Sequence, residues 1–248
     1  GAIEASENGM YLSSSDLECA FYHMKLPDGM ESMFTLPSIP AAVLQELGLV
    51  DLDFDPTARV TPMVTVLPMG FSWALHLCQS AARAVLAAGG HEKSMTALDG
   101  QAGVVVKTPD SVGVGAYVDN ILTFGTDKEA VDRVMARLVA AFRARGLPVH
   151  EIEPAARDAE VLGLSLRQGK FLRIKPRNIW RLHSAISGLW RRGWCSGHMM
   201  RAVLGHVTWA SMLRREVLTV LHSAYSFVAA YGERQGRLWA SAAKELTL

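Results

Sequence analysis

Alternating apolar and polar residues, together with runs of β-branched residues, predict β-strands in the first two thirds of the chain. Residues 10–36 alternate loosely around Asp16 and predict a strand that runs into a short helical turn at 17–22. Five further runs predict strands, at 60–67, 112–118, 121–124, 161–166 and 171–174. Asp119-Asn120 separates the second and third of these runs and is typical of a two-residue hairpin turn.

Apolar residues at helical spacing predict helices between these strands and, beyond residue 175, to the end of the chain. The clearest helix begins with the capping box Thr126-x-x-Glu129 and ends near Gly146. Its predicted apolar face consists of Val131, Val134, Met135, Leu138, Val139 and Phe142. The other predicted helices are 41–47, 72–88, 176–191, 197–214 and 216–231. Strands with interleaved helices, followed by a helical segment, favour an α+β fold.

The charges are unevenly distributed, although the net charge of the 248 residues is only +1. Residues 1–160 contain 11 Lys and Arg against 21 Asp and Glu, whereas residues 161–215 contain 11 basic residues and no acidic one. A long segment without carboxylates favours contact with a polyanion such as nucleic acid, because neutralising phosphates releases their counterions. An acidic partner, or the acidic first part of this same chain, is the alternative.

The remaining composition excludes several classes of protein. No apolar run reaches the length of a membrane span, so we expect no membrane partner. Three cysteines, far apart and odd in number, indicate neither a disulfide framework nor a zinc ribbon. They favour a reducing, intracellular compartment, cytoplasmic or nuclear.

Three short stretches carry the candidate chemistry: Ser15–Tyr22, Leu67–Ala74 and Ala116–Leu122. In this order they resemble motifs A, B and C of reverse transcriptases, especially those of retroviruses and retrotransposons. The capped helix at 128–146 resembles motif D, and the turn around Leu162-Gly163 resembles the motif E turn that grips the primer. The basic helical region resembles the thumb subdomain, so the resemblance covers about residues 10–230.

This resemblance implies a polymerase palm, an antiparallel sheet with packed helices, over residues 1–166. A basic, helical thumb is implied for residues 167–248. Only 15 residues precede Asp16, so the fingers subdomain that the family places there is expected to be absent from this chain. Further polyprotein domains, such as fingers and RNase H, or a larger assembly are then expected as partners.

The resemblance implies an RNA-directed DNA polymerase that adds deoxynucleotides with the help of two Mg²⁺ or Mn²⁺ ions. Such ions lie about 3.5–4 Å apart and bind the attacking and leaving oxygens. Asp16 and Asp119 would supply the catalytic carboxylates, and the carbonyl of Leu17 a further metal ligand, because hard ions prefer oxygen. Taken alone, either aspartate is better explained as a helix cap or a turn residue, whereas the pair within this pattern favours metal ligands.

The same resemblance implies residues that contact the dNTP, the RNA template and the DNA primer, or a hybrid duplex. Those near the nucleotide and primer end are Phe21, Met69, Gly70, Tyr117, Val118 and Asn120. Those on the duplex are Leu162, Gly163, Arg173, Lys175, Arg177, Arg181, Arg191 and Arg192. Ordinary core packing is the alternative for Phe21, and also for the tryptophans that lie among the basic residues.

One substitution in motif C leaves a second function open. The family usually has two aspartates there, and the second is Asn120 in this chain, so one negative charge is missing. The alternative is a non-catalytic reverse-transcriptase-like module that binds nucleic acid or acts as a scaffold.

Overall fold

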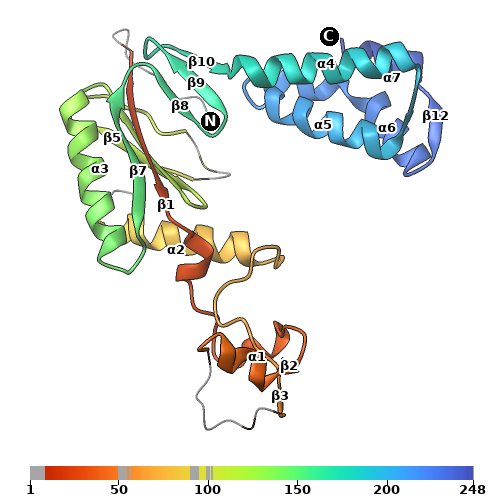
Figure 1. Ribbon diagram of the computed structural model, residues 1–248. Coiled ribbons are helices and arrows are strands. Elements are labelled where there is room, and N and C mark those ends of the chain that lie inside the picture. Colours follow the sequence, from red (N-terminus) through yellow and green to blue (C-terminus); the bar gives the residue numbers. More distant parts are fainter. Residues whose placement is uncertain are drawn as a thin grey trace. The chain divides into compact units, whose positions relative to one another are not determined.

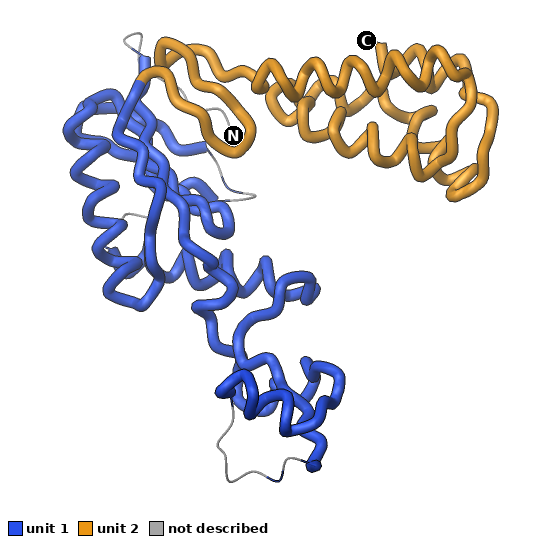
Figure 2. Tube along the Cα trace, in the orientation of Figure 1, with its two compact units in different colours: residues 1–156 blue, residues 157–248 orange. Residues whose placement is uncertain are grey.

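The computed structural model describes residues 9–49, 55, 57–89, 95–98, 101 and 103–247. The chain divides into two compact units, Gly1–Ala156 (unit 1) and Arg157–Leu248 (unit 2), each with its own hydrophobic core (Figure 2). The division lies ten residues before the boundary expected after residue 166. The hairpin that carries Gly163 therefore belongs to unit 2.

A five-stranded sheet in the order β4-β5-β6-β1-β7 forms the centre of unit 1 (Figure 1). Its strands are β1 (Tyr11–Leu17), β4 (Thr96–Ala97), β5 (Val112–Tyr117), β6 (Asn120–Gly125) and β7 (Val149–Ala156). All neighbouring pairs are antiparallel except the short parallel pair β4–β5. The α+β fold with a mainly antiparallel sheet is thus confirmed.

Two helices, α2 (Ala74–Ala88) and α3 (Lys128–Arg143), share one core cluster with this sheet. The six apolar residues predicted to form the face of α3 are all buried, from Val131 to Phe142. The helix is capped by Asp127, whose carboxylate accepts the N–H of Ala130 at 2.7 Å, and not by Thr126 as the capping box predicted. A carboxylate at this position also interacts favourably with the positive end of the helix dipole.

Between β1 and α2 the chain forms an irregular two-stranded ribbon, in which residues 24–41 pair with residues 58–67. It contains β2 (Ile39–Pro40), β3 (Arg59–Val60) and isolated bridges at Met63 and Val66. The continuous strand predicted at 60–67 is broken because Pro62 has no N–H and contributes only its carbonyl, which accepts the N–H of Leu36. The short elements nearby are η1 (Ala20–His23), η2 (Glu31–Met33) and α1 (Ala41–Glu46).

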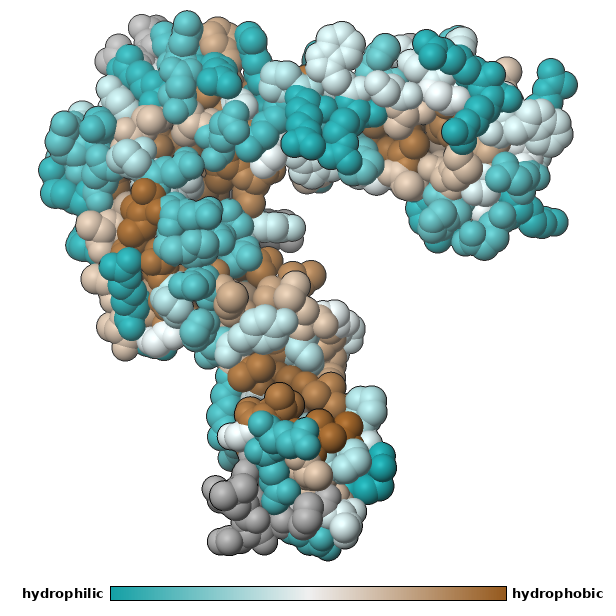
Figure 3. Space-filling view, in the orientation of Figure 1, coloured by the Kyte–Doolittle hydropathy of each residue, from teal (hydrophilic) through white to brown (hydrophobic). Residues whose placement is uncertain are grey.

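Large apolar side chains are exposed on this ribbon and on the loop that leads to α2. Figure 3 shows hydrophobic surface gathered on this part of unit 1. The exposed residues include Met33, Leu36, Met63, Met69 and Trp73. No charged side chain occurs between Arg59 and Arg83. Exposed apolar patches of this kind are typical of surfaces that contact other macromolecules.

Unit 2 begins with a three-stranded antiparallel sheet, β8 (Ala159–Val161), β9 (Leu164–Arg167) and β10 (Phe171–Ile174). The α-helices that follow are α4 (Pro176–Arg192), α5 (Gly197–Ser211), α6 (His222–Tyr231) and α7 (Ala240–Glu245). Between them lie the 3-10 helix η4 (Arg215–Val220) and two paired strands, β11 (Trp194–Ser196) and β12 (Gln235–Arg237). The first two predicted helices match α4 and α5. The third prediction combined η4 and α6, and α7 was not predicted.

Within the part of the chain that the structure describes, no helix is both long and apolar enough to cross a membrane.

Candidate functional site

Asp16 lies near the end of β1, between two neighbouring strands of the central sheet. Its Cα pairs with that of Asn120 on β6 and with that of His150 on β7. Alternation along β1 buries Ser13, Ser15 and Leu17 and leaves the Asp16 side chain about one third exposed. The carboxylate of Asp16 is therefore presented on the open face of the sheet.

The hairpin between β5 and β6 brings Asp119 to the same end of the sheet. Tyr117 pairs with Asn120, so the two turn residues are Val118 and Asp119. The predicted turn, Asp119-Asn120, was therefore one residue out of register, and Asn120 is the first residue of β6. Leu17 donates its backbone N–H to the carbonyl of Asp119 at 2.8 Å, which joins the end of β1 to the turn.

Val118 adopts a positive φ of 58°, an unusual conformation for a β-branched residue. The side-chain amide of Gln79 on α2 stabilises it through two hydrogen bonds to the backbone on the β5 side of the turn. Its Nε2 donates to the carbonyl of Ala116 at 2.8 Å, and its Oε1 accepts the N–H of Val118 at 2.7 Å. Gln79 cannot be recognised from the sequence, because only a fold that brings α2 against the hairpin gives this residue a role.

The two carboxylates influence each other electrostatically. The pKa of Asp16 is raised above its ordinary value, first by partial burial and next by the negative charge of Asp119. His150 opposes this shift. Behind the turn, burial and the charge of Asp119 raise the pKa of the Cys78 thiol to about 11. A cation bound between Asp16 and Asp119 would relieve their repulsion, so the pair suits a positively charged ligand.

Two polar side chains adjoin the pair. The amide of Asn120 donates to the carboxylate of Asp119 at 2.9 Å, where the motif C resemblance predicts a second carboxylate. His150 places Nε2 3.3 Å from the Asp16 carboxylate. His150 cannot be recognised from the sequence, since it lies 134 positions from Asp16 along the chain and meets it only through the β1–β7 pairing.

The residues fit a hard divalent ion in part. Asp16 and Asp119 offer carboxylate oxygens, and Mg²⁺ is commonly held by one or two carboxylates together with substrate phosphates and water. Among the residues that the structure describes, no group of three or more His, Cys, Asp and Glu is arranged to hold a metal ion by itself. A metal at this position would therefore depend on phosphate oxygens to complete its ligands.

The remaining residues predicted to contact the nucleotide lie on elements that lead away from this pair. Phe21 is part of η1 and packs in part against the core of unit 1, which is the alternative that its sequence left open. Met69 and Tyr117 are exposed. Gly70 has a φ of 93°, and an added Cβ would meet no other atom, so the glycine is needed for the turn conformation.

In unit 2, Leu162 and Gly163 are the two central residues of the β8–β9 hairpin, because Val161 pairs with Leu164. Both have positive φ, 48° and 80°, as a type I′ turn requires. A Cβ on Gly163 would lie 2.8 Å from the Trp209 ring, and the Gly163 carbonyl accepts the N–H of Lys175. The predicted turn thus packs on the indole of Trp209 in α5 and adjoins the start of α4.

Four predicted arginines form a stripe along α4: Arg177, Arg181, Arg191 and Arg192. At 100° per residue they fall within an arc of about 100°. All four are exposed, and the opposite face packs Leu182, Ile186 and Leu189 on the core. Within the described residues none of the four has an acidic partner. Unpaired cations on one helix face suit a polyanion.

The basic residues nearer the hairpin differ from this stripe. Lys175 forms an ion pair with Glu160 at 2.8 Å, which lowers the pKa of that carboxyl. Arg173 is exposed on β10 with its guanidinium 5.7 Å from the centre of the Phe171 ring. Lys175 is therefore less available to a ligand than the arginines of α4.

The fold resembles that of solved reverse transcriptases. Foamy viral protease-reverse transcriptase in complex with an RNA/DNA hybrid is similar, with a TM-score of 0.57 and 14% sequence identity over 96% of this chain and 26% of that one. A dRH form of that protein with double-stranded DNA gives a TM-score of 0.56 and 14% identity over 96% and 34% of the two chains. A further complex with double-stranded DNA gives 0.53 and 13% over 100% and 44%.

No protein-family model and no curated protein matches the sequence. The chain spans between about a quarter and less than half of the length of these solved structures. At this level of identity the likeness establishes a reverse-transcriptase-like fold.

Proposed function

We propose that this chain is the palm and thumb portion of an RNA-directed DNA polymerase. The observation that carries the proposal is the meeting of Asp16 and Asp119, 103 positions apart in the sequence, at one end of the central sheet. A carboxylate whose pKa is raised by a neighbouring carboxylate is expected where a divalent cation binds. The reverse-transcriptase-like fold supports the same conclusion.

In this proposal Asp16, Asp119 and the carbonyl of Leu17 hold Mg²⁺ or Mn²⁺ together with the phosphates of a dNTP. The metal, when bound, lowers the pKa of the primer hydroxyl and neutralises charge that develops on phosphate. Gln79 and the Leu17–Asp119 hydrogen bond fix the backbone beneath the carboxylates. Val118 and Tyr117 then present the turn to the primer end, and Met69, Gly70 and Phe21 border the nucleotide.

Unit 2 supplies the grip on the template and primer duplex in this proposal. The arginine stripe of α4 contacts phosphates, and the Leu162-Gly163 turn lies beside the primer strand. Ser184, with a small side chain, and Gly188, with none, lie between the arginines on the helix, which lets the nucleic acid backbone approach the helix closely. Such contacts make the affinity depend steeply on salt.

Primer extension on an RNA template, with Mg²⁺ or Mn²⁺, tests the catalytic part. We expect extension by the parent chain and a loss of at least about 100-fold in Asp16→Asn and Asp119→Asn, because each change removes a charged metal ligand. Asp158→Asn, on an exposed turn of unit 2, is the matched control and retains the parent activity. Absence of extension by the parent with either ion would contradict the polymerase proposal.

A salt titration of duplex binding tests the grip separately. Arg181→Gln/Arg192→Gln and Arg234→Gln/Arg237→Gln lose the same charge, but only the first pair lies on the α4 stripe. We expect the first double variant to flatten the slope of log affinity against log salt by about 1.8, since each phosphate contact contributes about 0.9. Equal slopes in the two variants would show that the stripe does not contact phosphate.

The amide of Asn120 favours a second candidate, a non-catalytic module of the same fold that binds nucleic acid. Asn120 leaves Asp119 with a neutral neighbour in place of a second carboxylate. This candidate gives a normal salt slope and no extension. It further predicts that Asn120→Asp does not create activity, whereas an impaired polymerase gains rate from that change.

A further inference from the structure

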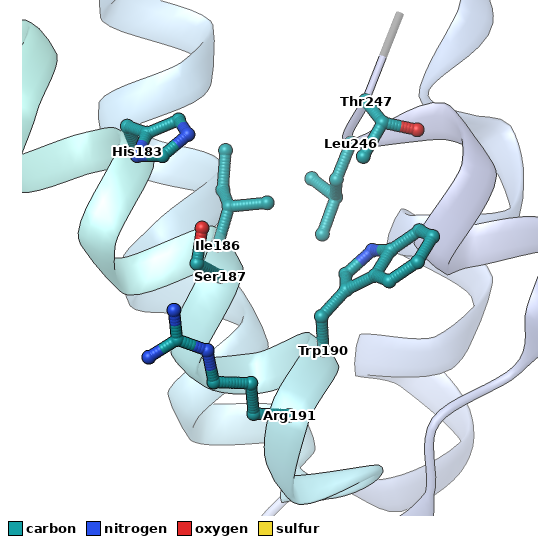
Figure 4. Close-up of a pocket in the computed structure, with 7 residues that line it drawn as sticks. All are labelled: His183, Ile186, Ser187, Trp190, Arg191, Leu246 and Thr247. Atoms are coloured by element: carbon teal, nitrogen blue, oxygen red, sulfur yellow. The ribbon is translucent and has the colours of Figure 1, made fainter.

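A pocket in unit 2 plays no part in the proposed site around Asp16 and Asp119, and of the arginine stripe of α4 it includes only Arg191. It has a volume of about 560 Å³ and lies between α4 and the residues that follow α7, Leu246 and Thr247 (Figure 4). Pockets for small organic ligands span roughly 300–1,000 Å³, so a ligand of the size of one nucleotide fits. The pocket is formed by unit 2 alone.

Side chains of α4 line the pocket in two rows. His183, Ser187 and Arg191 follow each other at intervals of four residues and form a polar row. Ile186 and Trp190, also four residues apart, form an apolar row beside it. Figure 4 shows Trp190 reaching from α4 toward Leu246, while Ser187 and Arg191 stay on the α4 side. The pocket therefore offers one polar and one apolar wall.

The groups on these walls are available to a ligand. In the part of the chain that the structure describes, Arg191 has no acidic partner and Ser187 has no hydrogen-bond partner. The indole of Trp190 is 53% exposed. Its Nε1 donates to the carbonyl of Ala243 at 3.2 Å, which holds the edge of the ring against α7, while the side chain lines the pocket. A positioned aromatic face costs little entropy when a flat ligand stacks on it.

We propose that this pocket binds an unpaired nucleotide, with the base stacked on Trp190 and the phosphate bound by Arg191 and Ser187. A simple anion would leave the indole and Ile186 unused, and an apolar ligand would bury Arg191 without a partner. A nucleotide satisfies both walls. The proposal rests on the proposed function only in assuming that unit 2 meets nucleic acid. The nucleotide has two sources, a free nucleoside monophosphate or an unpaired end of a strand.

The strand source is tested by fluorescence anisotropy with a labelled duplex, blunt or with a two-nucleotide 5′-phosphorylated overhang. We expect the overhang to increase the affinity of the parent at least about fivefold, as stacking of one base does. Trp190→Leu removes this gain, and Trp190→Phe keeps most of it because the ring remains. Trp194→Leu, an equally exposed tryptophan on β11 outside the pocket, keeps the full gain. Thermal melting confirms that each variant is folded.

Two results would contradict binding of an unpaired strand end. In one, the overhang does not increase the affinity of the parent; in the other, it increases the affinity of Trp190→Leu and Trp194→Leu equally. The free source is tested by calorimetric titration of dAMP. Saturable binding that is lost in both Trp190→Leu and Arg191→Gln, but not in Arg234→Gln, supports the pocket even if no duplex binds. Failure of blunt duplex binding contradicts the thumb function alone, whereas failure of both the overhang and the dAMP titrations overturns the pocket.

Discussion

Gln79 accepts the backbone N–H of Val118 at 2.7 Å and thereby fixes a turn whose φ is unfavourable for valine. We expect Gln79→Leu to destabilise unit 1 by about 1–3 kcal/mol, because the Val118 N–H and the Ala116 carbonyl lose their partner beside the core. Urea denaturation measures this loss. Gln235→Leu, exposed on β12, is the control and changes stability by less than about 0.5 kcal/mol.

The same variant separates structure from chemistry at the turn. Under the proposed function, we expect Gln79→Leu to lower primer extension, while the affinity for blunt duplex, which the proposal assigns to unit 2, stays unchanged. Equal loss of extension and of duplex affinity would indicate global unfolding. No change in either would show that Gln79 does not position the turn.

The ionised carboxylate of Asp16 makes the folded protein less stable than a neutral side chain at this position would. Its pKa is raised in the folded state, so protonation favours folding, and the ionised carboxylate costs stability at neutral pH. We expect Asp16→Asn to raise the melting temperature at pH 7 in the absence of divalent ions. The difference should shrink as the pH falls through the raised pKa of the parent. A variant that melts below the parent at pH 7 would contradict this assignment, and Asp158→Asn serves as the control.

Gly163 is required by both its conformation and its neighbour. Gly163→Ala combines a φ of 80° with a Cβ 2.8 Å from the Trp209 ring, so we expect a loss of about 2–3 kcal/mol in the free energy of unfolding. Gly193→Ala has a φ of 66° but no atom within 4 Å of the new Cβ, and should lose only about 1 kcal/mol. Similar losses in chemical denaturation of the two variants would show that the contact with Trp209 is not tight.

Glu245 caps a helix from a distance. Its carboxylate accepts the N–H groups of Ser223 and Ala224, both at 2.8 Å, at the start of α6. Burial is the largest single influence and raises the pKa of Glu245, but the hydrogen bonds from Ser223 and Ala224 and the nearby His222 together lower it more, so the net shift is downward. The stabilisation is therefore complete above the ordinary pKa of a glutamate and is lost as the pH falls through the lowered one.

We expect Glu245→Gln to cost about 0.5–2 kcal/mol at pH 7, the range of a helix cap, and less near pH 3. Thermal melting at the two pH values measures the difference. The exposed Glu233→Gln is the control, and a cost that does not depend on pH would exclude the capping carboxylate as its source.

The sequence predicted those features that depend on local pattern. The apolar face of α3 from Val131 to Phe142 is buried as predicted, because a repeat of 3.6 residues has only one way to face a core. The hairpin turn was placed one residue late. Asp-Asn is the commoner turn pair, whereas the structure places Val118 in the strained position and compensates through Gln79.

Features that depend on tertiary pairing could not be predicted. The segment at 60–67 has the β-rich composition of a regular strand, yet Pro62 lacks an N–H, and the segment forms a ribbon with isolated bridges. The contact between His150 and Asp16 requires the β1–β7 register, and the ion pair of Lys175 with Glu160 requires the β8–β9 hairpin. The third of the C-terminal helices is divided at Leu221, which is buried in the core of unit 2.

Position 120 could change easily between asparagine and aspartate during evolution. Asparagine and aspartate codons differ at a single base, so one mutational step separates this chain from a site with a third carboxylate. The amide bonded to Asp119 replaces a repulsion with an attraction. A lineage that changed Asn120 to aspartate would lose this hydrogen bond and gain a repulsion wherever cations are scarce, whereas a lineage that keeps asparagine keeps the hydrogen bond and has one charge fewer at the site. Selection on the two forms would therefore pull in opposite directions.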